Sequence, residues 1–382
     1  MKLLVLGAGF SGISAAFAAA RAGASVSVVH SGAGASALYA GAVDGSLSPD
    51  GPAQAGLLAE LGPLLGLCLT PNAQATVATR EGVVRGSAGA DVAVLNLAPL
   101  AGKRIGVVDV PRDDWDGPLL VRSFATSDWA RSTGTRFELV PLDLLEKSSQ
   151  RRVSPYDFAT SFERAERPAW LSAVLKARAG TDAWLFGPWL GVKRELGREL
   201  TASVGVPVGE VTSPPGGVAG ARFEARRDAL LLALGAQVVT ERARAVRTSA
   251  TGVVVTLDGG QELQADALVV AVGGIVSGAI RLVGALSGAE PAGFELSLSG
   301  LPLVQARGQL RRPVSSLYGV DLAAHGRVLL EHVGLAASAT GEVTGEPRVF
   351  AAGDLLAPQP PSVGHALLSG LRAGAAAAAL GS

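Results

Sequence analysis

The sequence predicts an α/β fold in which a Rossmann-type domain is interrupted by a second, mixed α/β domain. Three observations support this prediction. An apolar run at residues 2–6 leads into a glycine-rich turn, a mid-chain run at 267–272 ends in two glycines, and a run at 348–352 ends in Gly-Asp before an Ala-rich segment. Buried strands that end in glycine turns and lead into helices are typical of parallel sheets. The 382 residues suffice for two or three domains.

The composition indicates a globular chain and excludes several kinds of site. Apolar residues make up 48% of the chain, and 33 basic residues balance 33 acidic ones. This balance argues against a broad surface for nucleic acid. Cys68 is the single cysteine, which excludes an intramolecular disulfide, a cysteine-based zinc site and a four-thiolate iron–sulfur cluster. The four histidines lack metal-ligand spacing, so no metal site is predicted.

Periodicity and turn residues assign the elements of the N-terminal half. The first 20 residues resemble a signal peptide, but three glycines would each cost roughly 1 kcal/mol inside its apolar helix, so a strand and a turn are expected instead. Glu81-Gly82 is typical of a hairpin turn, Ser154 with Asp157 resembles a capping box, and Pro168 suits a first helical turn. The predicted elements are strand 2–6, helix 10–22, strand 25–29, helix 53–65, a hairpin reaching residue 85, strand 105–110, a helix from 154 and helix 168–177.

A Pro/Gly-rich run at residues 212–220 predicts a domain boundary before the C-terminal half. Arg372 and several glycines interrupt the last apolar run before it reaches the ~20 residues that span a bilayer, so no transmembrane helix is predicted. The predicted elements are helix 221–234, strand 237–239, two strands within 243–257, strand 267–272, strand 348–352 and a helix from about residue 364.

The N-terminal turn, residues 7–12, fits the pattern G-x-G-x-x-G between a strand and a helix. Gly7 permits a tight turn, Gly9 lets the backbone approach a pyrophosphate, and Gly12 lets the helix lie against the strand. The helix N-terminus favours the phosphate charge. We therefore predict a cofactor site that includes Phe10 and Ser11; the alternative is a turn that only packs a helix closely.

The second predicted strand lacks the acidic residue that usually binds ribose hydroxyls at its end. His30 and Ser31 follow Val29 there instead. A histidine can donate a hydrogen bond to a ribose or phosphate, so His30 is a cofactor candidate, with an ordinary surface role as the alternative.

The other cofactor candidates lie after the mid-chain and C-terminal strands. An aspartate after a buried strand can accept hydrogen bonds from a ribityl hydroxyl, and a helix N-terminus can face the N1/O2 edge of a flavin. Glycines at a strand end let backbone pass close to a cofactor. The alternative to a cofactor site is a structural role, in which the aspartate caps a turn and the following helix packs on the sheet without contacting a ligand. These candidates are Gly273, Gly274, Gly353, Asp354, Gly364, His365 and Ala366.

Together, GAGFSG, VAVGG and VFAAGD resemble the flavoproteins whose FAD-type Rossmann domain is interrupted by a second domain. Within that group the chain most resembles the B subunit of anaerobic glycerol-3-phosphate dehydrogenase. The residues that carry the resemblance are Ser36-Ala37-Leu38, Gly41-Ala42-Val43-Asp44, Ile105-Gly106-Val107, and Pro215-Gly216-Gly217 leading to Arg222.

The resemblance implies a flavin-dependent oxidoreductase that carries FAD or FMN, with Ser36 among the cofactor contacts. It also implies partner subunits, a catalytic flavoprotein and an iron–sulfur protein, with quinone as the eventual acceptor of electrons from a small-molecule substrate. Such a protein would be cytoplasmic, held at the inner face of the membrane through a partner. The lack of an acid at position 30 is compatible with FMN, which has no adenosine ribose. The alternatives are a free-standing FAD-dependent dehydrogenase or reductase of another small substrate, and a non-catalytic flavin-fold scaffold.

Four residues are candidates for chemistry or substrate binding. His365 and Tyr318 lie near predicted cofactor segments and can transfer protons. Arg222 and Arg311 can bind a phosphate or carboxylate bidentately, although most arginines are solvated surface residues. The predicted domains are a flavin-binding domain (1–50, 214–285 and 345–382) and an inserted substrate or partner domain (51–213 and 286–344).

Overall fold

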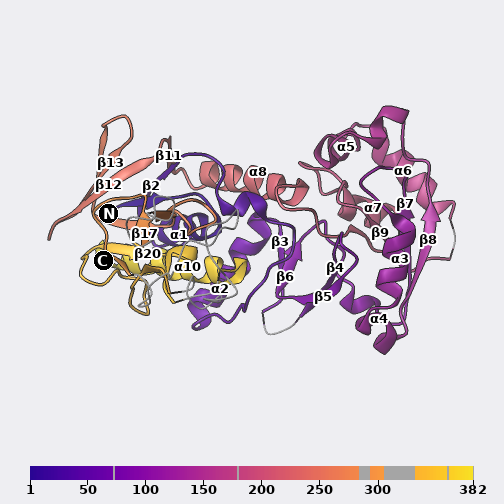
Figure 1. Cartoon of the computed structure of the whole chain (residues 1–382), viewed down its shortest axis with the longest axis horizontal. Helices are drawn as coiled ribbons and strands as arrows, with labels where there is room; N and C mark the ends of the chain where they lie inside the picture. Colours follow the sequence, from indigo (N-terminus) through magenta and orange to yellow (C-terminus); the bar gives the residue numbers. More distant parts are fainter. Residues whose placement is uncertain (72–73, 179, 284–292, 305–331, 359–360, 382) are drawn as a thin grey trace. The chain divides into compact units, whose positions relative to one another are not determined.

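The computed structural model describes the chain except residues 72–73, 179, 284–292, 305–331, 359–360 and 382 (Figure 1). Tyr318 and Arg311 therefore lie outside the described residues. Contacts divide the chain into two compact units. The first unit comprises Met1–Ser36, Pro49–Leu61 and Arg227–Ser382, and the second unit comprises Ala37–Ser48 and Gly62–Arg226.

These units differ from the predicted domains at four places. Residues 37–48 and 214–226 belong to the second unit, whereas residues 51–61 and the described residues between 286 and 344 belong to the first unit. The later boundary lies between Arg226 and Arg227, within helix α8 (Val218–Ala233), and not at the Pro/Gly-rich run before it. A turn-rich sequence therefore marks the start of α8, and the units divide inside the helix.

A five-stranded parallel sheet forms the centre of the first unit. Its order is β11 (Gln237–Thr240), β2 (Ser25–His30), β1 (Lys2–Leu6), β15 (Ala267–Val270) and β20 (Val349–Ala351). Every neighbouring pair is parallel. Counted along the chain, this order is 3-2-1-4-5, which is the order of a Rossmann fold. The predicted fold class is confirmed.

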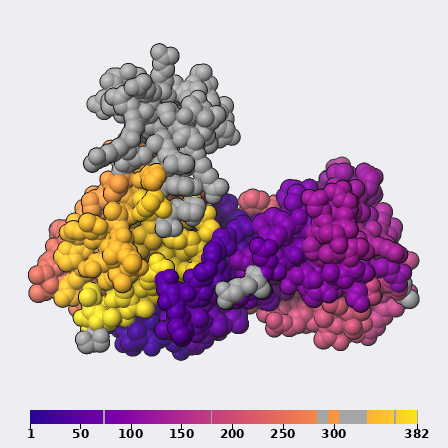
Figure 2. Space-filling model, turned by 90° about the horizontal axis from the view of Figure 1, so that it is seen from below, coloured from indigo at the N-terminus to yellow at the C-terminus, as the bar shows by residue number. Residues whose placement is uncertain are grey.

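Two helices that are far apart in the sequence pack on each other in the first unit. They are α1 (Phe10–Arg21) and α10 (Val363–Ala378). A Cβ atom on Gly370 would lie 2.2 Å from the Ser11 carbonyl oxygen, and one on Gly374 would lie 2.2 Å from that of Ala15. The glycines thus permit the close approach. Figure 2 shows residues from both ends of the sequence, coloured indigo and yellow, side by side on the surface of this unit.

Residues Val363–Gly381 are long and apolar enough to cross a membrane, by length and composition alone. One face of α10, however, is buried against α1 and the sheet. Burial of this kind is typical of a core helix.

Small antiparallel sheets and short helices complete the first unit. Between β11 and β15 the chain forms an antiparallel sheet in place of a crossover helix, and its apolar face packs on the parallel sheet. The remaining elements are α2 (Pro52–Leu64, which continues beyond the unit), β12 (Ala243–Thr248), β13 (Val253–Leu257), β14 (Glu262–Ala265), β16 (Ile280–Val283), β17 (Gly293–Leu296), β18 (Leu303–Val304), β19 (Gly334–Leu335), η4 (Gly353–Leu355) and η5 (Ala379–Gly381).

The second unit contains its own parallel sheet, with strand order β10 (Val208–Glu210), β9 (Ala183–Phe186), β7 (Arg104–Asp109) and β8 (Arg136–Pro141). Read from β8, the chain order is 2-1-3-4, a doubly wound arrangement. The other elements are η1 (Ala35–Leu38), β3 (Leu67–Leu69), β4 (Ala75–Ala78), β5 (Val84–Ser87), β6 (Gly89–Asp91), η2 (Ala98–Leu100), α3 (Gly117–Ala125), α4 (Asp128–Thr133), η3 (Ser148–Arg151), α5 (Pro155–Ser161), α6 (Arg167–Lys176) and α7 (Leu196–Val204).

Several aromatic residues contact one another in the core of the second unit. The Trp189 ring contacts Trp115 edge-on at 5.0 Å between centroids and Phe158 at 5.6 Å. The guanidinium of Arg112 lies 4.6 Å from the centroid of Phe158, a cation–π contact. All five tryptophans of the chain belong to this unit; the other three are Trp129, Trp170 and Trp184.

Candidate functional site

The glycine turn between β1 and α1 is closed by backbone contacts that no larger residue permits. Gly7 has a positive φ of 101°, and a Cβ atom on it would lie 2.2 Å from the carbonyl oxygen of Ala271, just after β15. A Cβ atom on Gly12 would lie 2.0 Å from the carbonyl oxygen of Gly7. The turn therefore lies against the carboxyl end of β15, at the edge of the sheet where Rossmann folds bind nucleotides.

The N-terminus of α1 has no capping side chain from its own N-cap residue. Its N-cap residue is Gly9, which has no side chain to cap the helix, and its first turn carries no acidic residue. The amide of Phe10 donates instead to Ser36 Oγ at 3.0 Å. A Cβ atom on Gly9 would lie 2.7 Å from the same oxygen. Ser36 therefore lies against the glycine turn.

The C-terminal candidates lie at the same place as the glycine turn. Gly353 has a φ of 75°, a Cβ atom on it would lie 2.5 Å from Ser11 Oγ, and its amide donates to Ser369 Oγ at 3.0 Å. A Cβ atom on Gly274 would lie 2.7 Å from the carbonyl oxygen of Asp354. Three segments more than 75 residues apart in the sequence therefore converge beyond the carboxyl ends of β1, β15 and β20.

Two side chains where these segments meet, Asp354 and His365, carry polar atoms that form no hydrogen bond with the described residues. Burial raises the pKa of the Asp354 carboxyl group, and no donor to that carboxylate is present in the described part of the chain. Nε2 of His365 is buried and also lacks a partner there. Burial and then the charge of Arg372 lower the pKa of His365, which hydrogen bonding to the Gly353 backbone partly opposes. Both burial and Arg372 therefore favour the neutral imidazole.

The remaining cofactor candidates lie at or near this site. Ser362 is the N-cap of α10 and accepts from the amide of His365 at 3.1 Å, so Gly364, His365 and Ala366 form the first turn of the helix. Gly273 has a φ of 79°, and a Cβ atom on it would lie 2.5 Å from Ser277 Oγ. His30 ends β2, and its Nδ1 accepts from the amide of Gly32 at 3.4 Å.

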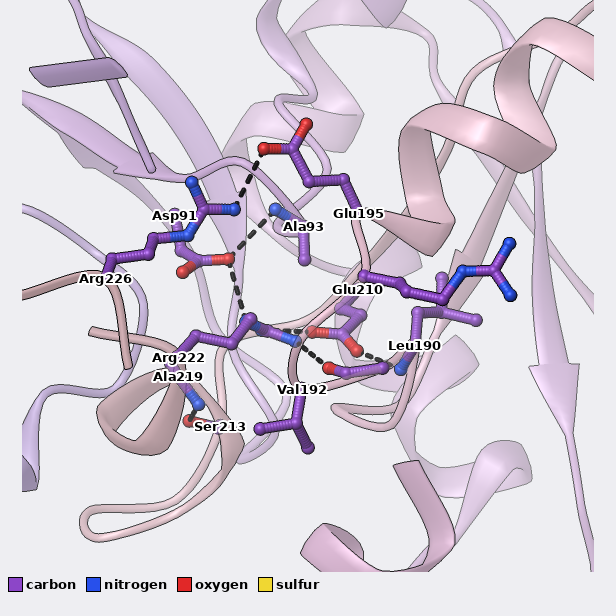
Figure 3. A network of polar contacts seen from close by, with 12 residues as sticks. Asp91, Ala93, Leu190, Val192, Glu195, Glu210, Ser213, Ala219, Arg222 and Arg226 are labelled. Atoms are coloured by element: carbon purple, nitrogen blue, oxygen red, sulfur yellow. Dashed lines mark hydrogen bonds and ion pairs between the residues drawn. The ribbon is translucent and has the colours of Figure 1, made fainter. Parts of the chain in front are cut away.

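Arg222 is not available to a substrate, so its prediction as a substrate residue is corrected. The residue is 2% exposed. Its Nε lies 3.1 Å from Asp91 Oδ1, one terminal nitrogen lies 2.6 Å from Glu210 Oε2, and the other donates to the Gly191 carbonyl at 2.8 Å (Figure 3). Burial raises the pKa of Glu210, which the charge of Arg222 partly opposes. Burial lowers the pKa of Arg222, but the charges of Asp91 and Glu210 outweigh this effect and raise it. This network ties β6, β10 and α8 together inside the second unit.

The second unit also has a cavity of about 580 Å³, which the sequence reasoning missed. Its volume is that of a small-molecule site. Some of its polar groups are already paired: Asp44 with Arg85, which is not part of the lining, at 2.6 Å, and the Ser46 hydroxyl with that of Ser48 at 2.8 Å. The only sequence signal near it was the segment 41–44. The lining residues are Val43, Asp44, Gly45, Ser46, Leu47, Ser48, Thr70, Gln74, Gly86, Ser87 and Ala88.

Comparison with known proteins gives structural likenesses only. No protein-family model matches the chain, and a search of curated proteins finds no match. Among solved structures, 3-ketosteroid Δ1-dehydrogenase from Sterolibacterium denitrificans is 13% identical with a TM-score of 0.41, and the alignment covers 99% of each chain. The 3-ketosteroid-Δ4-(5α)-dehydrogenase from Rhodococcus jostii RHA1 is 14% identical with a TM-score of 0.36, covering 98% of this chain and 96% of that one.

A third likeness is to a longer protein. Peptidyl tryptophan dihydroxylase QhpG is 15% identical with a TM-score of 0.24, and the alignment covers 71% of this chain but 32% of that one. The chain thus spans about a third of the length of QhpG. At these scores the likenesses assign neither an activity nor a cofactor, and the fold assignment of the first unit depends on its strand order.

Proposed function

We propose that this chain is a flavin-dependent oxidoreductase whose first unit binds FAD or FMN. The observation that carries the proposal is the convergence of the glycine turn, the Gly273-Gly274 end of β15 and the Gly353-Asp354 end of β20 at one edge of a 3-2-1-4-5 sheet. The N-terminus of α1 suits the phosphates of the nucleotide. The Asp354 carboxylate, which accepts no hydrogen bond from the described residues, suits a ribityl hydroxyl, and the buried Nε2 of His365 suits a polar edge of the ring.

A bound flavin supplies reversible two-electron chemistry. The residues of this chain would hold and orient it. The N-terminal turn of α10 would present its partial positive charge to the site, where a helix N-terminus favours negative charge. Because the pKa of His365 is lowered, its imidazole takes part as a neutral hydrogen-bonding group near pH 7 and not as a cation.

We further propose that the chain is the flavin-carrying B subunit of an anaerobic, quinone-linked glycerol-3-phosphate dehydrogenase. The resemblance of Ser36-Ala37-Leu38 and of the 41–44 segment to that family supports this. In this role it would act with a catalytic flavoprotein and an iron–sulfur subunit, in the cytoplasm at the membrane face, and pass electrons toward quinone. The single cysteine agrees that iron–sulfur clusters lie elsewhere.

The first test is the cofactor itself. The purified protein should be yellow, flavin absorbance should persist through gel filtration, and mass spectrometry should identify FAD or FMN. Gly9→Val should abolish retention because its side chain occupies the space between the turn and Ser36. Gly56→Ala is the matched control, since a Cβ atom there meets nothing within 4 Å. A colourless protein that takes up neither flavin would overturn the proposal and favour a non-catalytic scaffold.

The second test separates the two enzyme hypotheses. Under anaerobic conditions, a free-standing dehydrogenase should lose its flavin absorbance near 450 nm, a wavelength typical of oxidised flavin, when its own substrate is added. A B subunit should keep that absorbance with glycerol 3-phosphate alone and lose it only when the catalytic partner is present. Bleaching of the isolated chain by a small substrate would contradict the subunit assignment.

A further inference from the structure

Five basic side chains gather at the amino-terminal edge of the parallel sheet in the second unit. Arg104 is the first residue of β7, Lys103 precedes it, and Arg136 is the first residue of β8. Lys176 ends α6, and Arg178 lies in the segment that leads from there into β9. All five residues are exposed. We call this surface the basic edge.

Backbone and side-chain contacts bring the segments of the basic edge together. Arg104 and Arg136 are register partners in the parallel β7–β8 pair, so their side chains lie on the same face of the sheet. The amide of Arg136 donates to the carbonyl oxygen of Lys103 at 3.0 Å. A Cβ atom on Gly180 would lie 3.4 Å from a terminal nitrogen of Arg104. This guanidinium therefore reaches the segment that carries Arg178, and the charges share one surface.

Acids do not neutralise the charges of the basic edge. Among the described residues, none of its five side chains forms an ion pair or a hydrogen bond. Two acids lie nearby: Asp182 accepts from the backbone amide of Arg104 at 2.8 Å, and Glu138 on β8 forms no ion pair with the described residues. Like charges opposite each other on a sheet are destabilising, and the whole chain has no net charge. An excess of positive charge at this place therefore points to an anionic partner.

We propose that the basic edge binds the headgroups of anionic phospholipids, so that the second unit itself docks on an acidic membrane surface. Guanidinium groups bind phosphates bidentately, and each Lys or Arg close to an acidic membrane adds to the attraction. A protein partner fits less well, because the cores of protein interfaces are apolar and depleted in charge. Residues 101–104, 131–136 and 176–182, residue 179 excepted, contain no exposed large apolar side chain. This inference goes beyond the proposed function and does not require a bound flavin.

The test is sedimentation of the purified full chain with lipid vesicles. The protein should bind vesicles of equal parts phosphatidylcholine and phosphatidylglycerol, and should not bind vesicles of phosphatidylcholine alone. Raising the ionic strength from about 0.1 M to about 1 M shortens the Debye length from about 10 Å to about 3 Å and should abolish this binding. Arg104→Gln combined with Arg136→Gln should weaken binding to the acidic vesicles about 25-fold, since each charge near the surface contributes roughly 5-fold.

Two further double variants are the controls. Lys147→Gln combined with Lys193→Gln removes the same charge from exposed positions in the segments that follow the carboxyl ends of β8 and β9, at the opposite edge of the sheet. It should bind the acidic vesicles like the unaltered protein. Arg104→Lys combined with Arg136→Lys keeps both charges and should retain most of the binding.

The inference is wrong if the unaltered protein does not sediment with acidic vesicles, or if it sediments equally with neutral ones. Equal losses of binding in the two glutamine double variants would also overturn it, because the effect would then belong to net charge and not to the basic edge. If the Arg104 and Arg136 variant does not fold, Lys103→Gln combined with Lys176→Gln removes two other charges of the edge and should show the same loss. If polyglutamate binds at the basic edge and acidic vesicles do not, the partner is an acidic protein and the inference fails.

Discussion

At the scale of single residues, Arg222 shows how burial decides a role. Its guanidinium lies between Asp91 and Glu210, and all three side chains are almost fully buried. The sequence offers an arginine near a glycine-rich run, but the two acids come from positions 131 and 12 residues earlier. Such long-range pairing cannot be deduced from local spacing, so the sequence suggested a substrate ligand where the fold has an internal ion network.

We predict that Arg222→Met destabilises the protein by about 3–5 kcal/mol, because it leaves two buried carboxylates without their counter-charge. Arg85→Met is the matched control: the Arg85–Asp44 pair is exposed and should be worth no more than about 1 kcal/mol. Urea unfolding measures both. Since burial already raises the pKa of Glu210, protonation at lower pH should recover part of the loss. Equal effects of the two variants would contradict the structural role of Arg222.

A second residue-scale prediction concerns the pH dependence of stability at His365. Its pKa is lowered on folding, so the unfolded chain binds more protons between that lowered pKa and the usual value of ~6.5. The contribution of His365 to the free energy of unfolding therefore rises with pH through this window and is complete above it. The apoprotein should show this slope and His365→Gln should lose it. An identical slope in both proteins would show that His365 titrates alike in the two states.

At the scale of elements, the sequence predicted the first unit better than the second. Strand 2–6 is confirmed as β1, and the predicted helix start near 364 agrees with α10, which begins at Val363. A glycine follows β1 and a serine precedes α10, and such residues are recognisable in the sequence as element boundaries. In the second unit, β8, β9 and β10 were missed. β9 is a four-residue strand buried on both faces, and such a short apolar run has no periodicity to distinguish it from a buried helix segment.

The site shows the same division between local and long-range information. The glycine turn and the Gly353-Asp354 pair could be found because each needs a particular residue at a strand end. The sequence could not show that Ser36 caps α1, because that contact joins residues 26 positions apart. Nor could it show that Gly370 and Gly374 permit the close packing of α1 and α10, because those contacts join the two ends of the chain. Whether these residues contact a flavin stays a prediction.

The α1–α10 contact leads to an element-scale prediction. Gly374→Val should destabilise the first unit by at least about 1–3 kcal/mol and weaken flavin retention, because the new side chain would collide with the backbone of Ala15. Gly56→Ala in α2, where a Cβ atom meets nothing within 4 Å, should be neutral or slightly stabilising. Thermal unfolding and flavin release measure the two effects. Normal stability of the valine variant would show that the helices can separate without cost.

At the scale of the whole molecule, each unit has its own hydrophobic core. Each unit would also have its own spectroscopic signal. The five tryptophans report on the second unit, and a bound flavin would report on the first. In urea, Arg222→Met should lower the midpoint seen by tryptophan fluorescence more than the midpoint of flavin release. Gly374→Val should do the reverse. If each variant shifts both midpoints equally, the chain unfolds as one cooperative body.

The sheet of the first unit joins segments that leave the ribosome at very different times. β1 is translated before its partner β15 and before β20, which pairs with β15, and some 340 residues separate β1 from β20. At roughly 5–20 residues per second, that delay is on the order of 20–70 s. The second unit, whose residues all precede Arg227, can fold while the first unit waits for its last strand and helix. Binding of a cofactor at this sheet would therefore have to follow synthesis, and until then the apolar edge of β1 and the face of α1 that α10 covers are the surfaces a chaperone would have to shield.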